Sequence, residues 1–343
     1  MCTEGEHTNV RTRQNWTQLK QLLKPGVSCV ITSHYSPDGD AIGSELALAH
    51  FLRDIGARPH IINQDPVPRI YQFLDGAGDI RVYSPDADDE IIRNADVIFV
   101  LDISAWDRIG SPAAALKASP ATRICIDHHA TNDGMADLDL VDPAAAATGE
   151  LIYSMLTTFQ AAIPPAVARH LFVAIATDTG WFRFSNTTAV VFEIAADLTQ
   201  RGVSPAELYA RVHEHLRRER LALLSRGLGE LHSAADGRII WMAFTREMFE
   251  QTGADTEDVE GIIDLLRTIA GIDIAILFRE DTDGSVRVSL RSKIDADVSK
   301  LAEEFGGGGH TRAAGIRMTG TKLQQATERV VAAAENLLRR ENT

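Results

Sequence analysis

The chain has 343 residues, of which 45% are hydrophobic, and this length suits a globular protein of about two domains. Its formal net charge of -14 argues against a partner such as long nucleic acid, which requires a broad basic surface to displace counterions. The polar start of the chain has no apolar signal core, and no apolar run approaches the roughly 18 residues that cross a bilayer, so neither secretion nor membrane insertion is expected.

The first half of the chain alternates short apolar runs with helical or turn-rich stretches. Residues 27–34 (VSCVITSH) predict a buried strand, and a Pro-Asp-Gly-Asp turn leads into a helix over 39–56. Further strand-like runs lie at 57–63, 96–104 and 123–129. This alternation favours a mainly parallel sheet covered by helices, in which ligands bind beyond the carboxyl ends of the strands.

Helical patterns follow over 147–160, 166–178 and 187–202, so a first domain is expected over residues 15–200. Residues 201–226 are charged and mixed in sign, which predicts a semi-rigid connecting helix.

The remaining residues, 227–343, predict a second domain of α+β type. Strands are expected at 238–244, 273–280 and 285–293, and the Asp-Thr-Asp-Gly turn at 281–284 predicts a hairpin between the last two. The predicted fold class is therefore α/β, with a smaller α+β domain at the C-terminus.

Cysteine usage points to a reducing compartment. Cys29 and Cys125 lie inside apolar runs and Cys2 lies in the polar terminus, so neither a disulfide framework nor a Cys-x-x-Cys metal site is suggested. The expected location is the cytoplasm.

Three polar residues share the loop after the first predicted strand: His34, Asp38 and Asp40. Pro37 and Gly39 shape the backbone there, so that both carboxylates can turn inward. Asp38 and Asp40 can instead be turn and N-cap residues of the following helix, but that reading leaves His34 unexplained.

Other acidic and imidazole side chains follow later apolar runs: Asp102, Asp127, His128, His129 and Asp178. Each alone can be a cap, a surface residue or a turn residue, although a carboxylate that ends a helix opposes the helix dipole. Together, such groups would repel one another in one cleft unless cations lay between them, which indicates a two-metal hydrolase. Oxygen and imidazole ligands without thiolates suit Mn²⁺ or Mg²⁺, with Zn²⁺ or Co²⁺ as alternatives.

A glycine run near the C-terminus can bind an anion. Residues 306–309 are all glycine, and their unhindered N–H groups can form an anion nest beside His310, with Arg291 and Lys293 on the adjacent strand. The alternative is a simple loop with solvated basic residues.

At these residues the sequence resembles the DHH phosphoesterase family. The pattern His34-x-x-Pro-Asp38-Gly-Asp40, then Asp102, Asp127-His128-His129 and Asp178, reproduces its four motifs in order. Residues 289–293 (SLRSK) and 305–315 resemble the DHH-associated C-terminal domain of the NrnA-like subfamily of oligoribonucleases and pAp phosphatases. The resemblance implies an active-site cleft between the two domains, and it also implies a homodimer.

The resemblance assigns a role to each motif residue. It implies one Mn²⁺ held by His34, Asp38 and Asp102, and a second held by Asp40, Asp102, His128 and Asp178, with Asp102 bridging. His129 would face the scissile phosphate, and Asp127 would orient a neighbouring imidazole. The groups expected to hold the substrate's other phosphate are Arg291, Lys293, Gly307, Gly308, Gly309 and His310.

The expected activity is hydrolysis of short oligoribonucleotides to mononucleotides and of 3'-phosphoadenosine 5'-phosphate (pAp) to AMP, by two-metal activation of water. Alternatives are a phosphodiesterase for cyclic di-AMP or pApA, and an exopolyphosphatase or pyrophosphatase. A processive exonuclease is disfavoured by the acidic chain. From a different class, a nucleotide sensor without turnover is disfavoured by the intact set of metal ligands.

Overall fold

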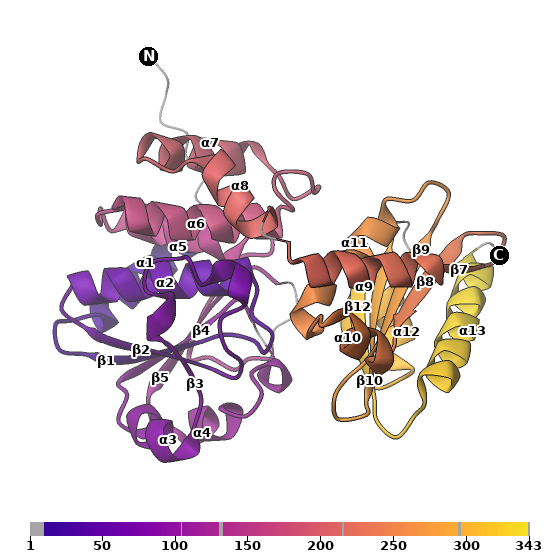
Figure 1. Ribbon diagram of the computed structural model, residues 1–343. Helices are drawn as coiled ribbons and strands as arrows, with labels where there is room; N and C mark the ends of the chain where they lie inside the picture. The colour runs from indigo at the N-terminus through magenta and orange to yellow at the C-terminus, as the bar shows by residue number, and fades with distance from the viewer. Residues whose placement is uncertain (1–9, 104, 130–132, 215, 294–295, 342–343) are drawn as a thin grey trace. The chain divides into compact units, whose positions relative to one another are not determined.

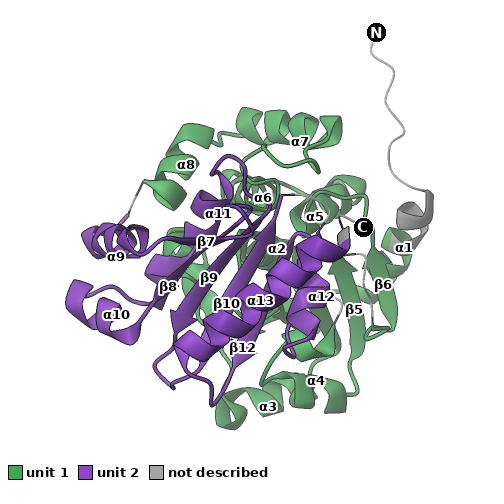
Figure 2. Ribbon diagram, turned by 90° about the vertical axis from the view of Figure 1, so that its right-hand side faces the viewer, with its two compact units in different colours: residues 1–215 green, residues 216–343 purple. Residues whose placement is uncertain are grey.

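The computed structural model describes residues 10–103, 105–129, 133–214, 216–293 and 296–341, apart from the side chains of 10–15, 310 and 341. The chain divides into two compact units, residues 1–215 and 216–343 (Figure 2). Within the described ranges, no helix is long and apolar enough to cross a membrane.

The first unit is built on a six-stranded sheet whose strands all run parallel, in the order β3-β2-β1-β4-β5-β6. The strands are β1 (Ser28–Thr32), β2 (Arg58–Asn63), β3 (Ile80–Val82), β4 (Val97–Leu101), β5 (Thr122–Asp127) and β6 (Leu138–Val141). All five residues of β4 are buried, as expected for a central strand covered on both faces. The predicted parallel sheet is confirmed.

Helices cover both faces of this sheet (Figure 1). One side carries α1 (Val10–Leu22), α2 (Gly39–Asp54), α5 (Thr148–Thr158), α6 (Pro165–Asp178), α7 (Ala189–Gln200) and α8 (Pro205–His213); the other carries α3 (Pro85–Arg93) and α4 (Ala113–Ala118). Because side chains alternate along a strand, Phe99 of β4 packs into the first layer, and Ile98 and Val100 pack into the second.

The second unit contains a mixed six-stranded sheet in the order β11-β12-β10-β9-β8-β7. Its strands are β7 (His232–Ala234), β8 (Ile239–Phe244), β9 (Ile274–Glu280), β10 (Val286–Ser292), β11 (Gly308–His310) and β12 (Ala313–Met318). Strands β8 and β9 pair in parallel, and the other pairs are antiparallel. The hairpin predicted between residues 273–280 and 285–293 is β9–β10.

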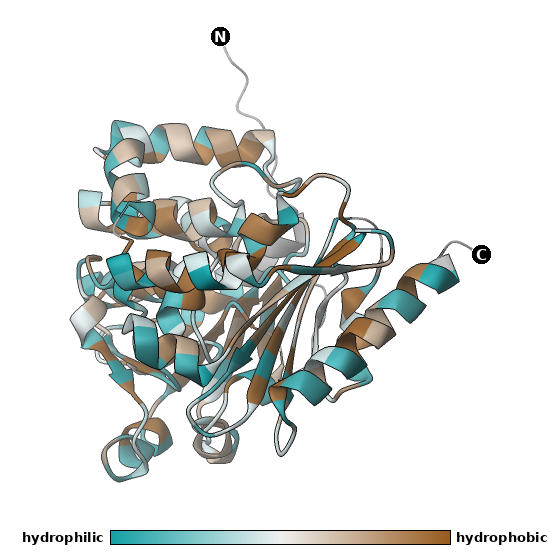
Figure 3. Ribbon diagram, turned by 45° about the vertical axis from the view of Figure 1, so that its right-hand side comes forward, coloured by the Kyte–Doolittle hydropathy of each residue, from teal (hydrophilic) through white to brown (hydrophobic). Residues whose placement is uncertain are grey.

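Two groups of helices pack on opposite faces of the second sheet. One face is covered by α12 (Val298–Glu303) and α13 (Leu323–Glu341), and the other by α9 (Arg218–Gly229), α10 (Arg246–Thr252) and α11 (Ile262–Arg267). Helix α13 places Ala326, Val330, Ala334 and Leu338 in the core at four-residue spacing, while the rest of the helix is largely polar (Figure 3).

The connection between the units differs from the single helix expected over 201–226. It consists of two helices, α8 and α9, because their apolar residues serve different cores. Leu208 and Val212 of α8 pack into the first unit, whereas Leu223 of α9 packs against the second sheet.

Candidate metal centre

The candidate ligands lie mainly at the carboxyl ends of three neighbouring strands. His34 lies two residues beyond β1, Asp102 directly follows β4, and Asp127, His128 and His129 occur at and after the end of β5. Because β1, β4 and β5 are adjacent and parallel, these side chains meet at one edge of the sheet. Asp178 joins them as the last residue of α6.

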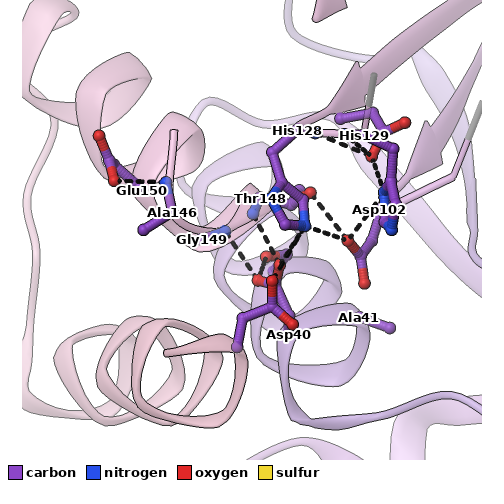
Figure 4. Close-up of polar contacts among 12 residues, drawn as sticks. Asp40, Ala41, Asp102, His128, His129, Ala146, Thr148, Gly149 and Glu150 are labelled. Atoms are coloured by element: carbon purple, nitrogen blue, oxygen red, sulfur yellow. Dashed lines mark hydrogen bonds and ion pairs between the residues drawn. The ribbon is translucent and has the colours of Figure 1, made fainter. Parts of the chain in front are cut away.

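Asp38 and Asp40 act at the start of α2. Asp38 caps this helix, since its Oδ1 accepts the N–H groups of Asp40 at 2.9 Å and Ala41 at 3.1 Å. The oxygens of Asp40 accept the N–H groups of Thr148 at 2.7 Å and Gly149 at 2.8 Å, in the first turn of α5 (Figure 4). The cap interactions with Asp40 and Ala41 both use Oδ1 of Asp38.

Asp102 lies between two imidazoles. Its Oδ2 is 3.5 Å from His34 Nε2, and its Oδ1 is 3.5 Å from His128 Nε2. The same His128 nitrogen is 3.0 Å from Asp178 Oδ2 and 3.8 Å from Asp40 Oδ2 (Figure 4). Asp102 therefore contacts both halves of the centre.

The donor atoms form three overlapping groups, within each of which all atoms lie within 4.8 Å of one another. The groups are His34, Asp38 and Asp102; Asp40, His128 and Asp178; and Asp102, Asp127, His128 and His129. The first two groups together contain every metal ligand that the sequence predicts. Carboxylate and imidazole donors without thiolates fit a pair of hard or borderline divalent cations.

The carboxylates of the centre show the cost of placing acidic groups together in a buried site. Burial, with the nearby charge of Asp102, raises the pKa of Asp38 to about 6. Burial, followed by the charges of Asp102 and Asp178, raises the pKa of Asp40 well above its usual range. Burial and neighbouring negative charge therefore shift both carboxyl groups toward the neutral form relative to exposed aspartates, and positive charge placed nearby opposes that shift.

The imidazoles supply positive charge when no ion is bound. Burial lowers the pKa of His34, but the hydrogen bond to Asp102 and the nearby carboxylates outweigh it and raise that pKa to about 9. For His128 the same balance, with hydrogen bonds to Asp102 and Asp178, gives a pKa of about 12. Burial would raise the pKa of Asp102, yet the two imidazoles hold it well below its usual range.

Asp127 holds the ring of His129 in place. Its Oδ1 is 2.6 Å from His129 Nδ1 and accepts the backbone N–H groups of His128 at 2.8 Å and His129 at 3.2 Å. Asp127 is fully buried, and His129 is partly exposed. This contact matches the orienting role that the resemblance implies for Asp127.

Backbone in the left-handed region occurs beside the candidate ligands. Asp102 has φ +60°, and Trp181 and Phe182, shortly after Asp178, have φ +59° and +63°. Residues other than glycine pay of the order of 1–3 kcal/mol each for such conformations, which cluster at functional sites. Asp102 is thus both a residue in this region and a member of a donor group, whereas Gln160, Ala235 and Asp236 also have positive φ and belong to no donor group.

Asn186 is a positioning residue that sequence reasoning missed. Its Nδ2 donates to the carbonyl oxygens of Asp178 at 3.1 Å and Ala146 at 3.0 Å. It thereby ties the end of α6 to the loop before α5, whose first N–H groups hold Asp40. The one signal for it is that it lies in the stretch DTGWFRFSNTT that follows Asp178.

A second missed group links the ends of β2, β1 and β4. Glu45, whose pKa burial raises to about 8, accepts a 2.9 Å hydrogen bond from Asn63 Nδ2. Asn63 Oδ1 accepts the N–H of Ser33 at 3.2 Å, and Ser33 Oγ donates to the carbonyl of Leu101 at 2.9 Å. An asparagine that ends an apolar run was the available signal.

The predicted substrate-binding residues lie in the second unit. Arg291 of β10 has its Nε 3.6 Å from Asp264 Oδ1, and Lys293 Nζ donates to the carbonyl of Ile269 at 2.5 Å. Gly308 and Gly309 pair with β12. The backbone of His310 belongs to β11, but its side chain lies outside the described part.

The glycine run is needed for close packing of backbones. A Cβ at Gly307 would lie 2.2 Å from the carbonyl oxygen of Gly315. The N–H groups of Gly306 and Gly307 donate to the carbonyls of Glu303 and Ala302. The nest expected over 306–309 is therefore wrong for its first two members, because those N–H groups end α12.

Two family profiles match the chain, one for each unit. Residues 28–175 match the DHH family, N-terminal domain, and residues 239–339 match the DHHA1 domain. The bifunctional oligoribonuclease and PAP phosphatase NrnA of Thermus thermophilus is 33% identical over 311 residues, which is 90% of each chain. The protein of the same description from Bacillus subtilis is 26% identical over 87% of this chain and 92% of its own.

A solved structure has the same fold over almost the whole length. An exopolyphosphatase-related protein from Bacteroides fragilis superposes with a TM-score of 0.88 at 28% identity, covering 96% of each chain.

Proposed function

The chain belongs to the DHH family, with a C-terminal DHHA1 domain, and from this membership we propose that it hydrolyses short oligoribonucleotides to mononucleotides and pAp to AMP. That it is a metal-dependent phosphoesterase follows from the family itself. The observation that carries the proposal is a pair of donor groups, one with His34, Asp38 and Asp102 and the other with Asp40, His128 and Asp178, linked by the 3.5 Å contact between Asp102 Oδ1 and His128 Nε2. The finer parts, the Mn²⁺ requirement and the two substrates, are supported by the donor chemistry and by the NrnA relatives.

We propose His34, Asp38 and Asp102 as ligands of one cation, and Asp40, Asp102, His128 and Asp178 as ligands of the other. When bound, two divalent cations lower the pKa of a water and stabilise charge on phosphoryl oxygens. Manganese is the preferred ion, with Mg²⁺ or Co²⁺ as alternatives.

The remaining chemistry comes from Asp127 and His129. His129 Nδ1 lies 2.6 Å from Asp127 Oδ1, so the Nε2 side of the ring remains for a phosphate oxygen of the substrate. The buried carboxylate of Asp127 fixes the ring orientation. We propose that His129 binds the developing charge of the phosphoryl group.

Arg291, Lys293, Gly308 and Gly309 are proposed to hold a phosphate that does not react. Arg291 and Lys293 provide cationic donors on one face of β10 and just beyond its end. The space where Gly308 would carry a Cβ is open, whereas a Cβ at Gly309 would lie 2.5 Å from the carbonyl oxygen of Ala313, so of the two only Gly308 offers room for close approach. We propose that the reaction takes place in the cytoplasm, because Cys29 and Cys125 are buried within apolar strands and suggest no disulfide framework.

The test is a panel of substrates at equal concentration with purified, Mn²⁺-loaded protein. Dinucleotide RNA should give mononucleotides and pAp should give AMP and phosphate, with slower turnover of cyclic di-AMP and polyphosphate. Faster turnover of polyphosphate, the substrate suggested by the description of the Bacteroides structure, would replace the proposal. A lack of turnover of both RNA and pAp in folded, metal-loaded protein would refute it.

The control is Asp178→Asn. Asp178 is partly exposed, and its described side-chain contact is with His128, so this change removes a proposed ligand without releasing a helix. Asp40→Asn is a poorer control because Asp40 also holds the first turn of α5. Activity in the Asp178→Asn variant equal to that of the unchanged protein would remove Asp178 from the site.

A further inference from the structure

Strand β10 has one apolar face, which packs into a core, and one polar face. Val286, Val288 and Leu290 pack toward α12 and α13, so Arg287, Ser289 and Arg291 point to the opposite face. On that opposite face, the apolar core under α9, α10 and α11 takes residues from β8 and β9 and, in the described ranges, none from β10 or β12.

Three arginines lie side by side across this face. Arg287 is directly opposite Arg279 on β9 and Arg317 on β12, and we call these three the arginine row. Like charges placed directly opposite on neighbouring strands destabilise a sheet. A row of this kind therefore needs compensating charge.

The turn between β9 and β10 supplies part of that charge. Asp281 pairs with Arg279 and with Arg287, at 2.8 Å in each case, and Asp283 pairs with Arg317. Two carboxylates thus face three guanidinium groups. Arg287 contacts Asp281 through Nε and is 46% exposed, and within the described residues its Nη groups have no hydrogen bond.

A pocket of about 170 Å³ opens beside the row, between the strands and the segment of η4 (Thr256–Val259) and α11. Its apolar wall is formed by Val259, Ile263 and Leu277. A cavity of roughly 150 Å³ accommodates a benzene ring, so this volume suits the ring of a nucleobase.

The polar lining of the pocket has two kinds of group. Arg279, Arg287 and Arg291 are cationic donors suited to phosphate, and Glu260 and Asp264 are acceptors suited to ribose hydroxyls or to the amino group of a base. The pocket therefore offers a partner to each part of a nucleotide: the apolar wall to the base, the carboxylates to the ribose, and the guanidinium groups to the phosphate. A bare phosphate or polyphosphate would leave the apolar wall without a partner and would be repelled by the carboxylates of Glu260 and Asp264.

We propose that this pocket is an additional nucleotide subsite, which holds a nucleoside unit of an oligoribonucleotide that pAp lacks. The base packs on Leu277 and Ile263, and Arg287 binds an adjoining phosphate that pAp does not have. The inference rests on the proposed function, since it concerns the choice among substrates of the same active site. It makes Arg287 a determinant of activity on RNA and not on pAp.

The test compares pAp with a 5'-phosphorylated pentaribonucleotide. Arg287→Ala should raise KM for the pentaribonucleotide roughly tenfold, as expected for one lost charge-assisted contact, and leave kcat/KM for pAp within about twofold. Ser289→Trp, which fills the pocket without removing a charge, should show the same selectivity. Retained pAp turnover demonstrates in each variant that the protein is folded.

The matched control is Arg246→Ala. Arg246 is an exposed, ion-paired arginine of the same unit that does not line the pocket, and its removal should change neither substrate. Unchanged RNA turnover in Arg287→Ala, or an equal loss on both substrates, would overturn the subsite.

A binding measurement separates this inference from the proposed function. Fluorescent pentaribonucleotide is titrated into the Asp178→Asn protein with and without Arg287→Ala, which needs no turnover. Binding that weakens about tenfold with Arg287→Ala supports the pocket even if catalysis proves to act on another substrate. Equal binding by both proteins rejects it.

Discussion

Asp127 accepts three N–H groups with a single oxygen, and one of them belongs to the ring of His129. The two backbone contacts place the turn after β5, and the ring contact sets the direction of the imidazole. An asparagine could still accept the backbone N–H groups, but a neutral amide is a weaker hydrogen-bond acceptor for the ring N–H of His129 than a carboxylate is. The two functions of Asp127 can therefore be separated by one substitution.

We expect Asp127→Asn to lower kcat on pAp roughly 10- to 100-fold, with a KM within about twofold, because a partner of the reacting imidazole is lost while binding is kept. His129→Ala should cause a similar loss. The double variant should be no slower than His129→Ala alone, since the two residues act as a unit. If the fold-loss of kcat in the double variant equalled the product of the two single losses, Asp127 and His129 would act independently.

Without bound metal ions, the imidazoles of the metal centre carry protons. The pKa values of His34 and His128, about 9 and 12, lie above neutral pH, so both imidazoles carry protons that a coordinating nitrogen must lose. Mn²⁺ binding at pH 7 should therefore release roughly two protons. Affinity should fall further as the pH drops through about 6, where Asp38 also gains a proton.

Calorimetric titration of Mn²⁺ in two buffers with different ionisation enthalpies measures this release. His128→Ala should release about one proton fewer than the unchanged protein. Binding whose apparent enthalpy is the same in both buffers would contradict the proposed ligand set.

At the scale of elements, α2 and α6 pack with almost no space between them. A Cβ at Gly43 would lie 2.4 Å from the backbone oxygen of His170. Both helices carry candidate ligands, Asp40 on α2 and Asp178 on α6, so their close approach helps to bring these carboxylates together.

Gly43→Ala should therefore lower the free energy of unfolding by roughly 1–3 kcal/mol, because the backbone of α6 must move away. Gly229→Ala is the matched control: Gly229 is also helical, and a Cβ there would meet nothing within 4 Å. Urea denaturation measures both variants. Equal stability of Gly43→Ala and the unchanged protein would show that the helices can separate without cost.

Element length partly explains which strands the sequence could reveal. The apolar runs of β1, β4, β5, β9 and β10 are long enough to show their pattern, and they were predicted. Strands β3, β7 and β11 have three residues each, too few to show any period, and they were missed. Such short strands at the edge of a sheet form because they pair with a neighbouring strand. A local sequence pattern carries no information about that neighbour. Strand β6, with four residues, and strand β12, with six, were also missed, so length is not the whole reason.

The same contrast holds at the site. Acidic and imidazole residues at strand ends could be recognised because their chemistry is unusual in apolar surroundings. Asn186 and Glu45 could not, since each acts through a hydrogen bond to an element distant in sequence. The sequence also could not show that the N–H groups of Gly306 and Gly307 bind carbonyls at the end of α12. No local pattern indicates where that helix ends.

At the scale of the whole molecule, the two units have separate cores, and every donor group lies in the first. Ligand binding stabilises only the folded region that contains the site. Mn²⁺ at about a hundredfold excess over Kd should stabilise the first unit by about 2.7 kcal/mol. The second unit should gain little.

Hydrogen exchange with Mn²⁺ or with EDTA measures the difference region by region. Amides of residues 28–178 should gain protection with Mn²⁺, and amides of 239–339 should not. Equal gains in both ranges would mean that the units unfold as one cooperative block.

The donors come from the loop after β1, the start of α2 and the ends of β4 and β5, and also from Asp178 at the very end of α6. Asp178 is therefore the last donor to leave the ribosome during translation. A nascent chain that stops short of α6 can contain His34, Asp38 and Asp102, but it lacks a member of the group formed by Asp40, His128 and Asp178.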